Sequence, residues 1–374
     1  MKNILKVLGL AVFLYIFFMS IGLIGSGFKG LGRDAAEKII QVTSSPFVAL
    51  FIGILVTSMV QSSSTVTSMI VTIVGAGVIP VHAAVPMIMG ANVGTSVTNT
   101  FVSIGHITRK GEFSKAVHAA TVHDIFNILA ILVLFPVEML TRAVFGIGLL
   151  EKGACLFSGC LGEGTEFTFK SPVKVIIKPA ISVIKKLLEG MELSDKFSAV
   201  ILIVLGFVLL FLALYLIVKI MKSLVLAKIE VLFDKVVGKK AYKGLILGIL
   251  ITAIVQSSSI TTSIMVPLAA AGVINIYQVL SITLGANIGT TVTALLASSA
   301  SGPAGVTIAL VHLFFNIFGA LIFWPGHNGG RLPVYLSEKL SDAAAKRRYI
   351  IFIYVATVFF LLPVVLILID KYLL

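Results

Sequence analysis

Two short polar runs lie inside stretches that are otherwise apolar, and both read Gln-Ser-Ser-Ser. The first begins at Gln61 and the second at Gln256. In hydrocarbon, hydroxyls and amides must be hydrogen-bonded or must bind a ligand, because an unsatisfied polar group is costly there. A helix starting after each run would aim its first N–H groups and its positive dipole end at the bend. The bends are therefore candidate sites for a tetrahedral oxyanion, with hydroxyl donors at Ser62, Ser63, Ser64, Ser257, Ser258 and Ser259.

The alternative for these serines is purely structural. Serine and threonine in membrane helices often bond back to their own turn and permit close helix packing. We favour a ligand site because the same four residues occur twice, 195 positions apart. Aligned without a gap, residues 61–98 and 256–293 share 18 identities in 38 positions, which identifies an internal duplication.

A second polar motif, Gly-Ala-Asn-x-Gly-Thr, follows each serine run. It covers residues 90–95 and again residues 285–290. A helix broken at this motif would expose carbonyl, amide and hydroxyl oxygens of the kind that broken transporter helices present to sodium. The side-chain donors would be Asn92, Thr95, Thr98, Asn287, Thr290 and Thr293. The alternative is a glycine kink in which the asparagine is only hydrogen-bonded.

A third matched motif places His123, Asp124 and Asn127 in the first half and His312 and Asn316 in the second. Asp124 is the one acid that we place well inside an apolar stretch, and such a residue is a functional hypothesis by default. Pairing with a polar neighbour is its structural alternative. The two histidines fit helix packing through hydrogen bonds better than ligand binding.

The composition excludes several classes of protein. With 58% hydrophobic residues, 12% charged residues and a mean hydropathy of +1.10, the chain is typical of a polytopic membrane protein forming one intramembrane body. The net charge of +13 lies mostly in the connections between apolar runs, which favours contact with lipid over nucleic acid. No metal-ligand cluster or P-loop motif is present, so an ion gradient is a better driving force than ATP. Adjacent residues on a helix point about 100° apart, so Asp124 could not easily orient His123 as a catalytic triad requires.

The elements that must position these residues are all helices. We expect crossings over 4–27, 116–136, 197–220, 306–324 and 349–374, and crossings broken at the glycine motifs over 83–104 and 276–298. Residues 46–79 and 244–273 are predicted to form re-entrant hairpins with the serine runs at their tips. Each arm of about 15 residues reaches only ~22 Å, whereas the hydrocarbon core is ~30 Å thick.

The number of crossings predicts how the two copies are related. Three crossings in the first copy leave the second copy starting from the opposite face, so the repeat is inverted and the two tips approach the midplane. The parts would be a first repeat over 1–136, an extracellular connection over 137–196, a second repeat over 197–325, and a basic cytoplasmic connection with a further span over 326–374. With the N-terminus in the cytoplasm, inner segments carry 17 Lys and Arg residues and outer segments carry 12, as expected for a plasma (inner) membrane protein.

The outer connection holds two further features. Residues 173–188 have an amphipathic pattern that predicts a helix lying along an interface. Cys155 and Cys160 are the two cysteines of the chain and fall on the face where a disulfide is permitted. The pair could form a disulfide or remain as two thiols.

These motifs resemble those of the type II sodium-phosphate cotransporters and their bacterial relatives. The matches are Gln-Ser-Ser-Ser-Thr, Gly-Ala-Asn-Val-Gly-Thr-Ser-Val-Thr-Asn-Thr, Ala-Thr-Val-His-Asp-x-Phe-Asn with a downstream Leu-x-Pro-Val-Glu, and the second-half Gln-Ser-Ser-Ser and Gly-Ala-Asn-Ile-Gly-Thr-Thr. They occur in the family's order and cover residues 46–138 and 244–325. The resemblance implies sodium-driven phosphate uptake through an all-α, inverted-repeat membrane fold, with no cofactor beyond the transported sodium ions.

The resemblance also implies roles for individual residues. The serines at 62–64 and 257–259 would hold phosphate. One sodium site would be formed by Gln61, Thr290, Thr293 and Asn316, and another by Gln256, Ser257, Asp124 and Asn127, with Asn92, Thr95 and Asn287 in support. An aspartate at position 124 goes with electrogenic transport in the family. Ala286 departs from the serine that relatives often have, which leaves one ligand of the second sodium site in doubt.

The sequence therefore predicts a secondary-active sodium-phosphate symporter in the lipid bilayer, and not an enzyme. Three alternatives remain open. The same architecture could move another oxyanion such as sulfate or arsenate, or act as an exporter. An intramembrane hydrolase would use a repeat serine and need no sodium, and a passive channel would not accumulate its solute.

Overall fold

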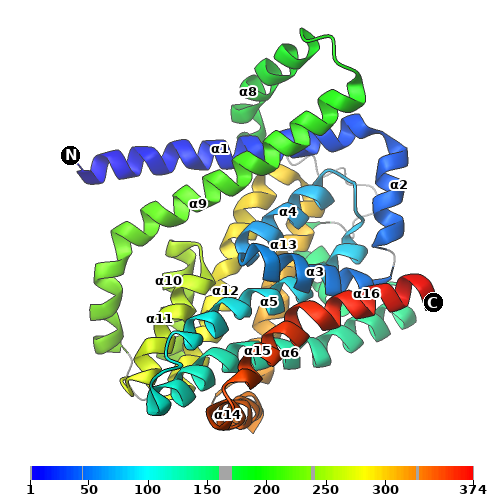
Figure 1. The fold of residues 1–374 in the computed structure, drawn as a ribbon. Coiled ribbons are helices and arrows are strands. Elements are labelled where there is room, and N and C mark those ends of the chain that lie inside the picture. The colour runs from blue at the N-terminus through cyan, green and yellow to red at the C-terminus, as the bar shows by residue number, and fades with distance from the viewer. Residues whose placement is uncertain (1, 44, 160–170, 237–240, 326–327, 374) are drawn as a thin grey trace.

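The computed structural model of the chain describes residues 2–43, 45–159, 171–236, 241–325 and 328–373. Within these ranges the chain forms helices and no strand (Figure 1). Six of the described helices are long and apolar enough to cross a membrane, namely Ile4–Leu31, Gly111–Phe145, Asp195–Leu224, Ile276–Ser301, Pro303–Ile322 and Tyr349–Tyr372. The expectation of an all-α polytopic membrane protein is confirmed.

The helices follow one another in chain order. The first half contains α1 (Lys2–Leu31), α2 (Arg33–Val42), α3 (Pro46–Val60), α4 (Ser63–Gly75), α5 (Val81–Ile104), α6 (Lys110–Phe145), α7 (Leu149–Ser158) and α8 (Pro172–Glu189). The second half contains α9 (Asp195–Val236), α10 (Ala241–Val255), α11 (Ser258–Ala270), α12 (Ile276–Ser301), α13 (Pro303–Ile322), a 3-10 turn (Asn328–Gly330), α14 (Arg331–Lys346), α15 (Tyr349–Val355), a π-helical segment (Ala356–Leu361) and α16 (Leu362–Leu373). Figure 1 places α8 at one end of the bundle and α14 at the opposite end.

Both Gln-Ser-Ser-Ser runs interrupt the helix, as predicted. The helices before the two bends have 15 residues each, and the helices after them have 13 residues each. Gln61 and Gln256 adopt left-handed backbone conformations, with φ of 56° and 61°. A left-handed non-glycine residue reverses the chain at a modest conformational cost, and the following serine then starts the next helix.

The predicted breaks at the Gly-Ala-Asn motifs are wrong. The helices α5 and α12 run without interruption through residues 90–95 and 285–290. The glycines serve close packing instead, because a Cβ at Gly90 would lie 2.0 Å from the Leu50 carbonyl oxygen of α3. The polar side chains bond within their own helix, where Asn92 Nδ2 donates to Ile88 O at 2.9 Å and Thr95 Oγ1 donates to Ala91 O at 3.0 Å.

The helix α5 has the length of a span but is not among the six apolar helices. Its residues from Ala83 to Val97 are buried apart from Met87. Because neighbouring helices shield it from lipid, its Gly, Ser, Thr and Asn residues carry no penalty from hydrocarbon contact.

The two halves exchange packing partners around their bends. Helices α3 and α10 pack against α5 and α12 of their own half. Helices α4 and α11 also cross over, so that α4 packs against α12 and α13, while α11 packs against α5 and α6. This exchange brings the starts of α4 and α11 into the middle of the bundle.

The connection predicted over 137–196 is largely helical in its described part. The third span, predicted to end at residue 136, continues as α6 to Phe145. The Glu138 carboxylate on α6 accepts from the backbone N–H groups of Leu150 at 2.6 Å and Glu151 at 3.4 Å, and so caps the start of α7. The predicted amphipathic helix is present as α8. Cys155 is buried on α7, whereas Cys160 lies outside the described residues, so their pairing stays a prediction.

Candidate functional site

The two bends meet each other at the centre of the protein. The hydroxyl of Ser64, in the first turn of α4, donates to the backbone carbonyl of Gln256 at the second bend, at 3.0 Å. The Thr293 hydroxyl on α12 donates to Gln256 Oε1 at 2.7 Å and lies 3.4 Å from Ser64 Oγ. Residues 192 and 229 positions apart in the chain therefore form one polar cluster.

Serine residues begin both helices after the bends. The Ser62 hydroxyl accepts from the backbone N–H of Thr65 at 3.3 Å, and the Ser257 hydroxyl accepts from that of Ile260 at 3.4 Å. Both serines are therefore N-caps, a structural role beside the phosphate site predicted for both and the sodium site predicted for Ser257. An N-cap hydroxyl still has a proton to donate, so capping and ligand binding are compatible.

The next serine in each run has a different environment. Ser63 and Ser258 occupy equivalent positions and are 5% and 3% exposed. Neither side chain makes a hydrogen bond within the part of the chain that the structure describes. Both hydroxyls lie in the first turn of a helix, where backbone N–H groups also lack intrahelical partners. Together with these N–H groups, they form two donor sets suited to an anion. Ser259 is partly exposed.

Asp124 is fully buried on α6. The Thr100 hydroxyl on α5 donates to its Oδ2 at 2.8 Å. Its Oδ1 has no hydrogen-bond partner of ordinary geometry among the described residues, although the hydroxyls of Ser96 and Tyr354 lie nearby. An anionic oxygen without a partner in the interior is costly, and a bound cation would satisfy it.

His123 belongs to a continuous chain of hydrogen bonds across the three helices α5, α6 and α12. Asn99 donates to its Nδ1 at 2.9 Å, so its Nε2 carries the proton and donates to Asn287 Oδ1 at 2.9 Å. Asn287 in turn donates to Asn127 Oδ1 at 2.7 Å, and Asn127 donates to the Asn92 carbonyl at 2.9 Å. The histidine is a packing hydrogen bonder, as the sequence favoured.

The equivalent histidine in the second half is less well satisfied. His312 Nε2 lies 3.4 Å from Asn92 Oδ1, while His312 Nδ1 and Asn316 Oδ1 have no partner among the described residues. The Asn316 amide nitrogen is already used, because it donates to the His312 carbonyl at 3.0 Å. An amide oxygen left in this way is a good ligand for a hard cation.

Hydrogen bonds among the described residues join members of the two predicted sodium sets. Thr293, from one set, is bonded to Gln256, from the other. Gln61 is exposed at its bend, whereas Gln256 is buried. Thr290 donates back to the Ala286 carbonyl at 2.9 Å. The ligand sets therefore remain predictions. Among the predicted sodium ligands, the buried oxygens without a partner in the described residues are Asp124 Oδ1, Asn316 Oδ1 and Thr98 Oγ1.

The polar centre contains no basic side chain. Among the described residues, the buried polar set includes no lysine and no arginine, and both buried histidines are deep in the network. A multivalent anion placed here would need positive charge from another source. A cavity of about 220 Å³ reaches Gln256 and Thr293, and its other lining residues are apolar.

Sequence reasoning missed several residues of this centre. Asn99 joins Thr262 and Ser263 of α11 to His123, and its Oδ1 accepts from these hydroxyls at 2.9 and 3.3 Å. Its spacing of seven from Asn92 places it on the same helix face and could have indicated it. No comparable signal pointed to Tyr354, which reaches Asp124 from a helix outside the repeat.

Comparison with known proteins gives a consistent set of relatives. The pattern of the Na+/Pi-cotransporter family matches residues 16–158 and 209–332. The sodium-dependent phosphate transport protein 2A of Rattus norvegicus is 34% identical over 427 residues, covering 96% of this chain and 67% of that protein. The sodium-dependent phosphate transport protein 2B of Homo sapiens is 32% identical over 438 residues, covering 94% of this chain and 63% of that protein. This chain thus spans about two thirds of the length of such relatives. No solved structure gave a significant match.

Proposed function

This chain belongs to the Na+/Pi-cotransporter family, and we propose that it is a sodium-coupled symporter that imports inorganic phosphate. The family consists of transporters, so the repeat serines need not be interpreted as the nucleophiles of a hydrolase. The observation that carries the proposal is the contact between the two bends, from Ser64 to Gln256, because it joins two anion-binding helix starts in one buried centre.

Phosphate would be held between the starts of α4 and α11. Ser63 and Ser258 supply donors that no described residue uses, and the capping hydroxyl of Ser257 retains its proton, whereas Ser62 Oγ also shares a hydrogen bond with Thr65 Oγ1 at 2.8 Å. The positive ends of both helix dipoles would act on the anion from two sides. The Ser64 hydroxyl would leave the Gln256 carbonyl when phosphate arrives, which would couple binding to the contact between the bends.

Sodium ions would supply the positive charge that the centre lacks. Asp124 Oδ1 and Asn316 Oδ1 fit this role because both are buried and have no hydrogen-bond partner among the described residues. One sodium would use Gln256, Ser257, Asp124 and Asn127, and another would use Gln61, Thr290, Thr293 and Asn316. Neither phosphate nor sodium would be stable in the dehydrated centre alone, so coupling would be electrostatic. With a carboxylate at one sodium site, transport would be electrogenic.

The topology that we propose is an inverted repeat in a plasma membrane, with the N-terminus in the cytoplasm. The helix pairs α3–α4 and α10–α11 would be re-entrant, because none of the four helices exceeds 15 residues and ~20 are needed to cross. The exchange of packing partners between the halves supports a repeat whose two bends face each other.

Uptake of radiolabelled phosphate into proteoliposomes tests the proposal. We expect accumulation against a phosphate gradient when sodium is outside, and none when potassium or choline replaces it. Equal uptake in potassium would overturn the sodium coupling. Competition by sulfate and arsenate distinguishes phosphate from other oxyanions, and a reversed sodium gradient distinguishes an importer from an exporter. Protein-free liposomes give the background.

A further inference from the structure

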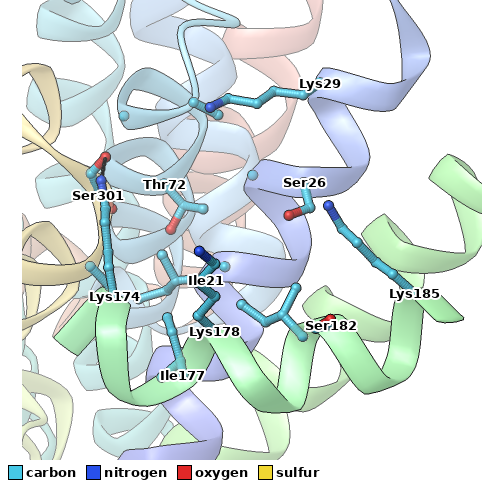
Figure 2. A pocket seen from close by; sticks show the side chains of 16 residues that line it. Ile21, Ser26, Lys29, Thr72, Lys174, Ile177, Lys178, Ser182, Lys185 and Ser301 are labelled. Carbon is cyan, nitrogen blue, oxygen red and sulfur yellow. Dashed lines mark hydrogen bonds between the residues drawn. The ribbon is translucent and has the colours of Figure 1, made fainter.

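A second polar cavity lies far from the centre, between α1, α4, α8 and α12 (Figure 2). Its volume is about 460 Å³, within the range of roughly 300–1,000 Å³ usual for small-molecule sites. Its lining includes Thr72 and Gly75 at the end of α4, whereas the bend lies at the start of that helix. Thr72 follows Ser63 by nine residues of α4, so at ~1.5 Å per residue the two sites lie about 14 Å apart along this helix.

Four lysines line this cavity, Lys29 from α1 and Lys174, Lys178 and Lys185 from α8, and none of its 16 lining residues is acidic. Figure 2 shows the Lys185 amine directed towards Ser26 and the Lys178 amine directed from α8 towards α1 and α4. Lys29, Lys178 and Lys185 have no ion-pair partner among the described residues. Elsewhere in the described chain the partly buried Arg142 is paired, with Glu138 at 3.7 Å and with Glu151.

Lys174 differs from the other three lysines because its amine already has a hydrogen-bond partner. Its Nζ donates to the Ser301 carbonyl at 3.3 Å, at the end of α12. Burial lowers the pKa of the Lys174 amine below its usual range, and the neighbouring charge of Lys29 lowers it further. Lys29 and Lys174 thus repel each other, and an anion near them would relieve this repulsion.

The cavity is built by close packing and is not a chance gap between surface side chains. Ile177 and Ile181 of α8 contact α1, where a Cβ at Gly22 would lie 2.3 Å from Ile181 Cδ1. The lining therefore combines an apolar wall of α1 and α8 with amines and with the hydroxyls of Ser26, Thr72, Ser182 and Ser301. Amines and hydroxyls together suit a phosphate group, which accepts several hydrogen bonds and carries negative charge.

We propose that this cavity binds a phosphate group through Lys29, Lys178 and Lys185, separately from the transport site. The group would come either from inorganic phosphate in solution or from the headgroup of an anionic lipid. Because α8 lies at one end of the bundle and the lining has an apolar wall, both sources can reach it. The site needs no sodium, since its own amines supply the positive charge.

The test compares two double variants of equal charge in the full chain. Lys178→Gln/Lys185→Gln removes two amines from the cavity, whereas Lys152→Gln/Lys186→Gln removes two exposed lysines of the same region that do not line it. One arm measures binding of radiolabelled inorganic phosphate to detergent-purified protein in potassium buffer. Without sodium, the proposed transport site does not bind phosphate. The other arm measures retention of phosphatidylglycerol over phosphatidylcholine by native mass spectrometry.

We expect the cavity variant to weaken binding about tenfold in one of the two arms, and the control variant to behave as the unchanged chain. Loss in the phosphate arm identifies inorganic phosphate, and loss in the lipid arm identifies an anionic headgroup. If the two double variants behave alike in both arms, the proposal is overturned. Lys29→Gln, on α1, gives the same comparison if the double variant of α8 does not fold. Sodium-dependent uptake, measured separately, reports on the proposed function alone.

Discussion

The two halves of this protein share a backbone plan but differ in the polar groups at their centres. In the first half, Asn99 and Thr100 on α5 bond to His123 and Asp124 on α6. In the second half, the positions 195 residues after Asn99 and Thr100 hold Ala294 and Leu295 on α12. The position 189 residues after Asp124 holds Leu313, beside His312 on α13. The duplicated helices are thus retained, while the buried Asp124 carboxylate and most of its hydrogen-bond partners belong to the first half.

The bends differ in the same way. Gln256 is buried and bonded to Thr293, whereas Gln61 is exposed. The Thr252 hydroxyl donates to Thr261 at 2.8 Å and links the arms of the second bend. In the first half the position equivalent to Thr261 is Val66, and the Thr57 hydroxyl has no partner among the described residues. Duplication fixes where groups can be placed, and divergence of single side chains then makes the two bends unequal.

The largest expected effect tests whether the helices pack equally closely at the duplicated glycines of the two halves. A Cβ at Gly90 or at Gly285 would lie 2.0 Å from a backbone carbonyl oxygen of the helix packed against it. We expect Gly90→Ala and Gly285→Ala each to destabilise the fold by about 3 kcal/mol, because overpacking against backbone cannot be relieved by a rotamer change. Thermal unfolding in detergent measures this. Gly111→Ala, with nothing within 4 Å, is the control. Loss of stability in only one of the two variants would show that the packing is not duplicated.

The next prediction tests the charge that only the first half carries. Asp124→Asn keeps the shape of the side chain but removes a buried anionic ligand, which costs about 3 kcal/mol or roughly a hundredfold in affinity. We expect the transport current to disappear while some sodium-dependent phosphate uptake remains. Currents on solid-supported membranes and tracer uptake measure the two quantities. Asp342→Asn, on the exposed face of α14, is the matched control. Unchanged currents in Asp124→Asn would contradict the role of this residue.

A third prediction asks whether both bends hold the same anion. Ser63→Ala and Ser258→Ala each remove an equivalent hydroxyl that no described residue uses. A hydrogen bond to a charged group is worth ~1.5–3 kcal/mol, so each change should raise the KM for phosphate about tenfold or more. Uptake kinetics at saturating sodium measure it. Ser103→Ala, whose hydroxyl donates to the Thr100 carbonyl at 2.7 Å, serves as control. Unchanged kinetics in both bend variants would remove the bends from the phosphate site.

The smallest effect distinguishes the two histidines. His123 uses both ring nitrogens, whereas His312 has one weak contact at 3.4 Å. We expect His123→Leu to lower the free energy of unfolding by about 1 kcal/mol more than His312→Leu, because it leaves two buried amides without partners. Denaturation in detergent checks the difference, with the exposed His82→Leu as control. Equal losses would mean that the network of the first half is no stronger than that of the second.

Much of the centre could be predicted from the sequence because the signals are local. A serine that starts a helix and a glutamine that ends one are set by neighbouring residues, so the bends after Val60 and Val255 were found in the right places. The break expected at residues 90–95 was wrong because two glycines and an asparagine suit both a broken helix and a close helix contact. Which of these forms depends on whether Leu50 of another helix packs there.

The sequence by itself determined the membrane class, the duplication, the two bends and the residue types available for an oxyanion and a cation. These follow from composition, periodicity and short-range capping, which need no partner elsewhere in the chain. The tertiary structure alone decided that Asn287 bonds to His123, that Ser64 meets Gln256, and that Tyr354 approaches Asp124. These contacts join residues more than 160 positions apart, and hydrogen bonds at that separation depend on how whole helices pack, which no local pattern encodes.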